Sequence, residues 1–277
     1  MRRARPDRFA GEAVLERLLA RARAEAWRKR AIGERIGAIG LALVGTPYVA
    51  ATLEGGGGRE VCSVNLRGLD CVTFVETALG VARMLKGGGR TPRALLEQVR
   101  FTRYRAGRVR GYASRLHYTS DWLADNARKR VVRLVTCELP GAARWEKRVS
   151  FMSTHPAAYP ALAADPALVQ ALARIEGRLS GRPMVYLPKD RVADVQPSLM
   201  TGDIVGITTS IEGLDCAHAG LCYRDEQGRV RLLHASTTTQ EVTLDDELTA
   251  YLARVRTHTG IIVARPLDPT RRRVGRR

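Results

Sequence analysis

Apolar residues near the start of the chain recur at helical spacing. Between Asp70 and about Lys86 they fall on one helix face, at Val72, Val75, Leu79, Ala82 and Leu85. Asp70 is a residue type that favours the N-cap position, and the glycines at 87–89 mark the end of the segment. The pattern therefore predicts a helix that begins directly after Asp70.

Three other parts of the chain carry helical patterns. Residues 12–45 are rich in Ala, Leu and Arg and predict helices that end near Gly45. Thr91 and Pro92 are typical of an N-cap and a first helical position. Residues 101–190 have a mixed pattern, in which one helix is predicted around 165–179.

After Pro197 the pattern changes to short runs of small and β-branched residues separated by turn residues. These runs predict strands at 202–210, 215–224, 230–242 and 257–266. Helices followed by an antiparallel sheet indicate an α+β fold.

Composition and charge narrow the class of protein. The chain has 277 residues, of which 45% are hydrophobic, enough for a substantial core. No stretch of 18 apolar residues predicts a transmembrane helix, and residues 1–30 lack the apolar region of a secretory signal. The net charge of +18 first suggests a polyanion partner. However, the charge is concentrated at the ends, since residues 268–277 contain five Arg and one Asp.

The tetrapeptide Gly-Leu-Asp-Cys occurs twice, at 68–71 and at 213–216. The first copy places Cys71 at the predicted start of a helix, where unpaired backbone amides favour a thiolate. Cys71 is therefore a candidate nucleophile, although a buried apolar role would suit most free cysteines. The five cysteines are too few, too irregularly spaced and odd in number for a disulfide scaffold. They include no CxxC pair, which weakens the case for a structural zinc site.

Two of the five histidines, His218 and His234, fall in consecutive predicted strands. An even register in that hairpin would pair them directly, with residue numbers that sum to 452, and place both imidazoles on one face. One imidazole could then act as a base for a thiol while the second orients it. The alternative is two hydrogen-bonded histidines on a half-buried sheet.

Longer motifs carry a family resemblance. The stretches LDCVTFVE, GDIV followed by HAG, and LLHAS resemble the NlpC-type branch of papain-like cell-wall hydrolases. Further stretches resemble one subfamily, formerly a domain of unknown function and since described as N-acetylmuramoyl-L-alanine amidases. They are GTPYVA, YASRLHYTSDWLADN and FMSTHP, and the similarity runs from about residue 35 to 266.

The resemblance implies a papain-like fold, with a helix-borne cysteine packed against an antiparallel sheet. It implies Cys71 as nucleophile, His218 as general base and acid, and His234 as the residue that orients His218. The implied reaction cleaves the amide between N-acetylmuramic acid and L-Ala in peptidoglycan fragments. Neither the residues nor the resemblance implies a cofactor or a catalytic metal, and nothing predicts an oligomeric state.

The resemblance also implies binding residues. Tyr48 and Asp70 resemble residues beside the family's catalytic groove, although core packing suits the Tyr48 ring equally. Arg115, His117 and Trp122, with Tyr118, belong to the subfamily's insertion, where a cation and aromatic rings suit a carboxylate and a sugar. A packed helix start is the alternative for that cluster. We expect Glu76 to anchor neighbouring loops.

The implied division of the chain is a basic helical extension at 1–34, one catalytic domain at 35–267, and a basic tail at 268–277. The insertion covers about 100–190. The family implies action in the cell envelope or periplasm, but no signal peptide is predicted, so cytoplasmic action on recycled muropeptides stays open. Cys216 stands where an apolar residue is expected, and we expect it on the same strand face as His218.

Three alternative functions remain open from the sequence. A related enzyme could instead cut the bond between γ-D-Glu and the diamino acid. A zinc protein could use Cys71, Cys216, His218 and His234 as ligands. A basic protein could bind nucleic acid or an envelope polyanion, although no specific nucleic-acid motif is present.

Overall fold

The computed structural model describes residues 8–54 and 60–269 and has the predicted α+β composition. Most of the predicted loop at 54–58, the first seven residues and most of the basic tail lie outside the described residues. In the described part, no helix has the length and apolar character needed to cross a membrane. The three-part division of the chain remains a prediction.

The predicted N-terminal helices are confirmed. They are α1 (Glu12–Ala24), α2 (Ile32–Ala42), α3 (Cys71–Lys86) and α4 (Pro92–Arg103). Asp70 caps α3, because its carboxylate accepts a 2.8 Å hydrogen bond from the Thr73 amide while the Thr73 hydroxyl accepts from the Asp70 amide. Thr91 caps α4, and Pro92 occupies its first position.

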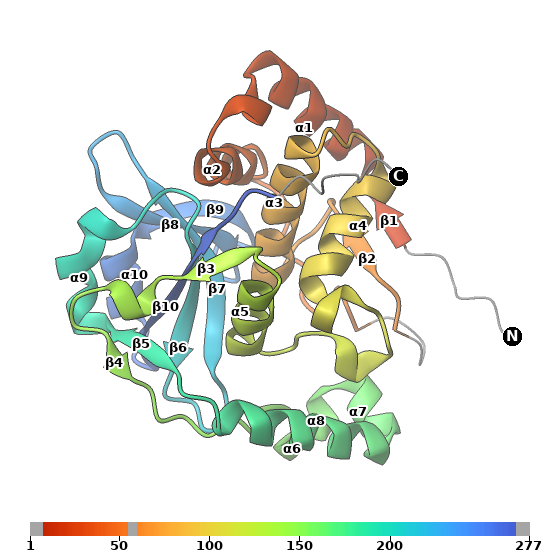
Figure 1. Ribbon diagram of the computed structural model, residues 1–277, viewed down its shortest axis with the longest axis vertical. Helices are drawn as coiled ribbons and strands as arrows, with labels where there is room; N and C mark the ends of the chain where they lie inside the picture. The colour runs from red at the N-terminus through yellow and green to blue at the C-terminus, as the bar shows by residue number, and fades with distance from the viewer. Residues whose placement is uncertain (1–7, 55–59, 270–277) are drawn as a thin grey trace, which may run out of the picture.

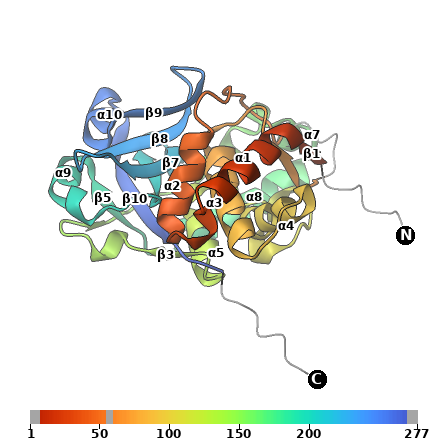
Figure 2. The ribbon, with the colours of Figure 1, turned by 90° about the horizontal axis from the view of Figure 1, so that it is seen from above.

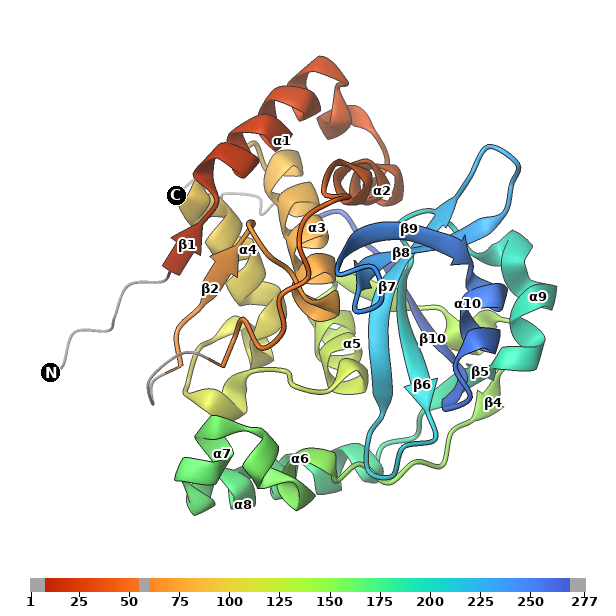
Figure 3. The ribbon, with the colours of Figure 1, turned by 180° about the vertical axis from the view of Figure 1, so that it is seen from behind.

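The insertion forms four helices, and part of it has a small core of its own. These are α5 (Thr119–Arg128), α6 (Phe151–Thr154), α7 (Pro160–Ala164) and α8 (Pro166–Ser180). Helix α8 is the helix predicted around 165–179, and Asp165 caps it. Tyr118, Met152 and Leu172 belong to this core. Figures 1 and 3 show α6, α7 and α8 grouped at one end of the molecule, below α4 and α5.

One antiparallel sheet forms the C-terminal half. Its strands run in the order β4 (Ala143–Arg144), β5 (Val185–Pro188), β10 (His258–Pro266), β6 (Ile204–Thr209), β7 (Cys216–Arg224), β8 (Val230–Ser236) and β9 (Glu241–Glu247), with β3 (Val132–Leu134) also paired to β10. The single strand predicted at 230–242 is wrong, because the chain turns at residues 237–240 and begins β9. A parallel pair of β1 (Arg8–Ala10) and β2 (Ser63–Asn65) was not predicted.

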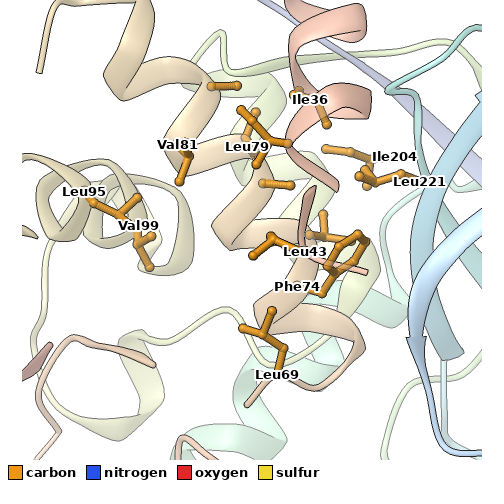
Figure 4. Close-up of a cluster of buried hydrophobic side chains, with 14 of the residues drawn as sticks. Ile36, Leu43, Leu69, Phe74, Leu79, Val81, Leu95, Val99, Ile204 and Leu221 are labelled. Atoms are coloured by element: carbon orange, nitrogen blue, oxygen red, sulfur yellow. The ribbon is translucent and has the colours of Figure 1, made fainter. Parts of the chain in front are cut away.

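Each face of the sheet has its own apolar core. Side chains of α2 and α3, including Ile36, Phe74 and Leu79, gather with Ile204 and Leu221 of the strands (Figure 4). The other face is covered by α9 (Val192–Val195) and α10 (Leu248–Arg254), seen beside β8 and β10 in Figure 1. Helix α3 thus lies against one face of the sheet, and its N-terminus becomes part of a cavity.

The predicted direct pairing of His218 with His234 is wrong, but the prediction that both lie on one face of the sheet is confirmed. Leu221 pairs with Leu233 and Arg224 with Val230, so paired numbers sum to 454 rather than 452. A shift of two residues preserves the face that each side chain occupies. His218 and His234 are therefore diagonal neighbours, and Gly220 lies between them opposite His234, with space for only a hydrogen at its Cα.

Candidate active site

A cavity of about 450 Å³ opens where the N-terminus of α3, strand β7 and the insertion meet. Of the eight residues predicted as catalytic or substrate-binding, six line it, namely Tyr48, Asp70, Cys71, Arg115, His117 and His218. Residues from the two copies of the tetrapeptide, separated by more than half the chain, are thus brought to one place. Trp122 and His234 are not part of the lining.

Cys71 is the first residue of α3 and is partly exposed to the cavity. Backbone amides of Ala219, Val72 and Cys71 itself lower the pKa of the thiol, as expected for a helix N-terminus. Burial outweighs them and, with the Asp70 carboxylate, raises the pKa of Cys71 to about 12. The helix N-terminus thus favours the thiolate, as predicted, but burial outweighs this effect and the thiol is neutral near pH 7.

The two imidazoles are joined by a short hydrogen bond. Nε2 of His218 lies 2.6 Å from Nδ1 of His234, with the rings edge to face at 4.8 Å between centroids. Burial, followed by the nearby His234 and His258, lowers the pKa of His218 to about 3. Burial also lowers the pKa of His234, although Asp245 opposes that shift. Both rings are therefore neutral near pH 7.

Asp245 on β9 fixes which nitrogens carry protons. Its Oδ2 lies 3.2 Å from Nε2 of His234, and its Oδ1 accepts from Arg254 at 2.5 Å. Burial raises the pKa of Asp245, but hydrogen bonds from Arg254 and the Asp246 amide outweigh it and lower the pKa. An ionised carboxylate only accepts, so His234 donates from Nε2 and accepts at Nδ1. His218 must then donate from Nε2, which leaves Nδ1 as its basic nitrogen.

Sequence reasoning missed Asp245 and a second group, Tyr251 of α10. The Tyr251 ring lies 5.1 Å from the His234 ring and 6.0 Å from the His218 ring, measured between centroids, and stacks on His258. The alternation in β9 places Asp245 two residues beyond Thr243, which pairs with His234. Asp245 could therefore have been predicted from the strand alternation, whereas the position of α10 and its Tyr251 could not.

Tyr48 and Asp70 lie at the cavity beside Cys71. A β-bridge joins Tyr48 to Leu69, directly before Asp70. Burial, together with the negative charge of an ionised Cys71 or Asp70, raises the pKa of Tyr48, so its hydroxyl keeps its proton. Tyr48 is thus available as a hydrogen-bond donor at the cavity.

The insertion residues differ from what the resemblance implied. Arg115 lines the cavity but is only 4% exposed, and its guanidinium already binds Glu54 at 2.6 Å and the Leu53 carbonyl at 2.9 Å. A free cation for a substrate carboxylate is therefore a wrong expectation for Arg115. His117 packs on Tyr112, and burial lowers the pKa of His117 to about 3.

Trp122 lies in the core, so contact between its ring and a sugar is also a wrong expectation. Its indole nitrogen donates to Oε1 of Glu76 at 3.1 Å, while Arg103 donates to Oε2 of the same carboxylate at 2.7 Å. Glu76 is 1% exposed and is a structural anchor, as predicted, but it joins the helices α3, α4 and α5 rather than loops.

The second tetrapeptide contributes a helix cap from a distance. Asp215 is buried and accepts from the Ser120 amide at 2.7 Å, at the start of α5. A β-bulge follows, because Ile207 pairs with His218 and Thr208 with Cys216. The bulge turns Cys216 toward Gly206 and Ala219, so its predicted position on the His218 face is wrong.

The zinc hypothesis required one ligand set from Cys71, Cys216, His218 and His234. Within residues 8–54 and 60–269, no group of three or more His, Cys, Asp or Glu side chains is arranged to hold a metal ion. The five cysteines are all unpaired.

Comparison with known proteins adds a family. The model of the AmiA-like family, described as N-acetylmuramoyl-L-alanine amidase-like, matches residues 38–266. No curated protein sequence matches the chain.

Solved structures agree with this match. An N-acetylmuramoyl-L-alanine amidase from Bacteroides uniformis is 35% identical, with a TM-score of 0.78 over 85% of this chain and 98% of that one. A Bacteroides fragilis structure provisionally described as a xylanase is 36% identical, with a TM-score of 0.76 over 82% and 99% of the two chains. A Legionella pneumophila protein is 20% identical, with a TM-score of 0.67 over 94% and 99%, and shows similarity of fold alone.

Proposed function

The chain belongs to the AmiA-like family of N-acetylmuramoyl-L-alanine amidase-like proteins, and from that premise we propose a cysteine amidase that acts on peptidoglycan fragments. An enzyme with amidase-like activity is what the family and its solved members support. The proposal adds the mechanism and the bond. The bond is the amide between the lactyl group of N-acetylmuramic acid and L-Ala, and the NlpC-type papain-like grouping stays a prediction.

One observation carries the mechanism. Cys71 and His218 line the same cavity, and Nε2 of His218 is hydrogen-bonded to His234. Because thiol and imidazole are both neutral at rest, the thiolate has to form during attack. The Cys71 sulfur attacks the lactyl carbonyl carbon while Nδ1 of His218 takes the thiol proton. His234 stabilises the resulting imidazolium, supported by the Asp245 carboxylate.

The remaining steps return the protein to its starting state. The C–N bond of the tetrahedral intermediate breaks, and His218 gives its proton to the leaving L-Ala amine. A thioester then joins Cys71 to the lactyl carbonyl. Water attacks this thioester with His218 as base, the C–S bond breaks, and His218 returns the proton to the Cys71 sulfur. The muramic acid leaves as a carboxylic acid, which ionises in solution. Backbone amides at the start of α3 and the Tyr48 hydroxyl are the donors available to the developing oxyanion.

The test is incubation of defined muropeptides with the wild type and with Cys71→Ala, read by mass spectrometry. We expect the wild type to release a peptide that begins with L-Ala and the variant to release none while its circular dichroism is unchanged. Cys137→Ala is the matched control, because Cys137 is exposed and does not line the cavity. A Cys71→Ala variant with full activity would refute the mechanism.

The same spectra separate the alternative bond. A stem shortened after γ-D-Glu would identify an endopeptidase and refute the amidase assignment while leaving the cysteine mechanism in place.

A further inference from the structure

A second cavity, of about 420 Å³, lies beside helix α1 and carries a row of arginines. We call it the arginine groove. Its lining consists of Val14, Arg17, Leu18 and Arg21 of α1, Ala42 at the end of α2, residues 44–47 after α2, and Leu66 and Arg67. Aliphatic side chains and Pro47 supply apolar surface, and none of the lining residues is acidic.

One wall of the groove belongs to a segment outside the family match. The match begins at residue 38, whereas α1 ends at Ala24. Helix α1 is nevertheless firmly attached, because Leu15, Leu18 and Ala22 are buried in the same core as α3. Figures 2 and 3 show α1 lying along the outside of α2 and α3. The groove is therefore built by this chain's N-terminal extension together with the catalytic scaffold.

The groove and the active-site cavity share two chain segments. Pro47 lines the groove and Tyr48 lines the cavity, while Arg67 lines the groove and Cys71 the cavity. The two segments are tied together, since the Leu69 amide donates to the Pro47 carbonyl at 3.0 Å and the Val49 amide donates to the Leu69 carbonyl at 3.1 Å. Four residues of extended chain span at most about 14 Å, so the Arg67 and Cys71 backbones lie within that distance.

Two of the arginines in the groove have guanidinium groups without a partner in the described residues. Arg17 and Arg67 are exposed, and within residues 8–54 and 60–269 neither guanidinium has an ion pair or hydrogen-bond acceptor. Arg21 differs, because its Nε already donates to Glu25 at 2.5 Å. Two free guanidiniums beside an apolar surface suit a ligand with carboxylates on a short, weakly polar chain, which describes an acidic peptide.

We propose that the arginine groove binds carboxylates of the peptide stem attached to the scissile amide. The inference rests on the proposed function, which puts that amide at Cys71. A stem joined through the γ-carboxyl of D-Glu keeps a free α-carboxylate, and its C-terminus supplies another. An extended stem of three residues spans about 10 Å, and the γ-linkage at D-Glu lengthens it, so a tripeptide stem reaches from Cys71 toward Arg67. In this proposal, Arg17 and Arg67 bind the substrate carboxylates that Arg115 was expected to bind, because Arg115 is already paired with Glu54.

The experiment compares two substrates: a muramoyl tripeptide with free carboxylates and the same compound with those carboxylates amidated. For the double variant Arg17→Ala/Arg67→Ala, we expect KM for the acidic substrate to rise about three- to tenfold with kcat unchanged. That is the size expected for two exposed ion pairs. KM for the amidated substrate should change less than about twofold, and high salt should erase the difference between wild type and variant.

Arg23→Ala is the matched control, because Arg23 is exposed on the same helix and lies outside the groove lining. Equal KM changes for the two substrates, or a double variant that behaves like Arg23→Ala, would overturn the proposal.

A binding measurement separates this proposal from the proposed reaction. Fluorescence anisotropy of a labelled L-Ala-γ-D-Glu-diamino acid peptide is measured with Cys71→Ala, and then with Arg17→Ala/Arg67→Ala added to it. A several-fold weaker Kd caused by the two arginine changes supports the groove even if the wild type cleaves no muropeptide. An unchanged Kd refutes the groove even if cleavage occurs.

Discussion

Replacing Asp245 with Asn should damage the enzyme more than replacing it with Ala. In the structure, Oδ1 of Asp245 accepts from Arg254 at 2.5 Å and from the Asp246 amide at 2.7 Å, while Oδ2 faces His234. Neither of the two donors can accept a hydrogen bond. The single oxygen of an Asn side chain therefore stays on their side and turns its NH₂ group toward His234.

That NH₂ group reverses the proton order along the two rings. Nε2 of His234 must then accept, so its proton moves to Nδ1 and is donated to Nε2 of His218. The proton of His218 moves in turn to Nδ1, which removes the basic nitrogen needed by Cys71. Asp245→Ala removes the hydrogen bond without imposing this order.

The two variants differ in expected magnitude. A hydrogen bond to a charged group contributes about 1.5–3 kcal/mol, and the 3.2 Å distance between His234 and Asp245 favours the lower half of that range. Asp245→Ala should therefore lower kcat/KM about ten- to thirtyfold. Asp245→Asn should lower it more than about 100-fold, because the base itself is lost.

The assay is kcat/KM on a defined muropeptide, together with ¹⁵N NMR of the histidine rings to identify the protonated nitrogens. Asp246→Asn is the matched control, because it makes the same change at the neighbouring exposed carboxylate and keeps the backbone donor. An Asp245→Asn variant as active as Asp245→Ala, or with Nδ1 of His218 unprotonated, would refute the reasoning.

Three further predictions concern stability and packing. Glu76→Gln should lower the free energy of unfolding by about 3–5 kcal/mol, because it leaves the buried Arg103 without its charge partner; urea denaturation checks this against exposed Glu97→Gln, expected below about 1 kcal/mol. Gly220→Ala should lower kcat/KM at least about tenfold with the fold retained, because its Cβ would lie 3.2 Å from Cβ of His234; Gly177→Ala, with open space, is the control, and equal activity of the two would contradict the argument. Stability should fall as the pH drops below 6.5, because His117 and His218, with folded pKa values of about 3, stay neutral while the unfolded chain takes up protons. Each histidine adds a slope of about 1.4 kcal/mol per pH unit, so His117→Gln should flatten the fall measured between pH 6.5 and 5, and an unchanged slope would count against the buried neutral state.

Local patterns were sufficient for much of the fold. The caps of α3 and α4 and most strands of the sheet follow from side-chain types and spacing within a few residues. Local patterns did not predict strand register. The bulge at Ala217 turns Cys216 to the opposite face, and a register shift of two separates His218 from direct pairing with His234.

The two copies of Gly-Leu-Asp-Cys show where sequence information ends. In the first copy, Asp70 caps the helix that follows it, because the N-cap contact joins residues three apart and depends on local chemistry alone. In the second, Asp215 caps α5, which lies 95 residues away along the chain. The sequence by itself determined the helix-borne cysteine, the placement of two histidines on one face of the sheet and the α+β order. Only the tertiary structure decided that Arg115 is already paired, that Trp122 is core and that Asp245 orients the histidines, because those contacts depend on packing between distant segments.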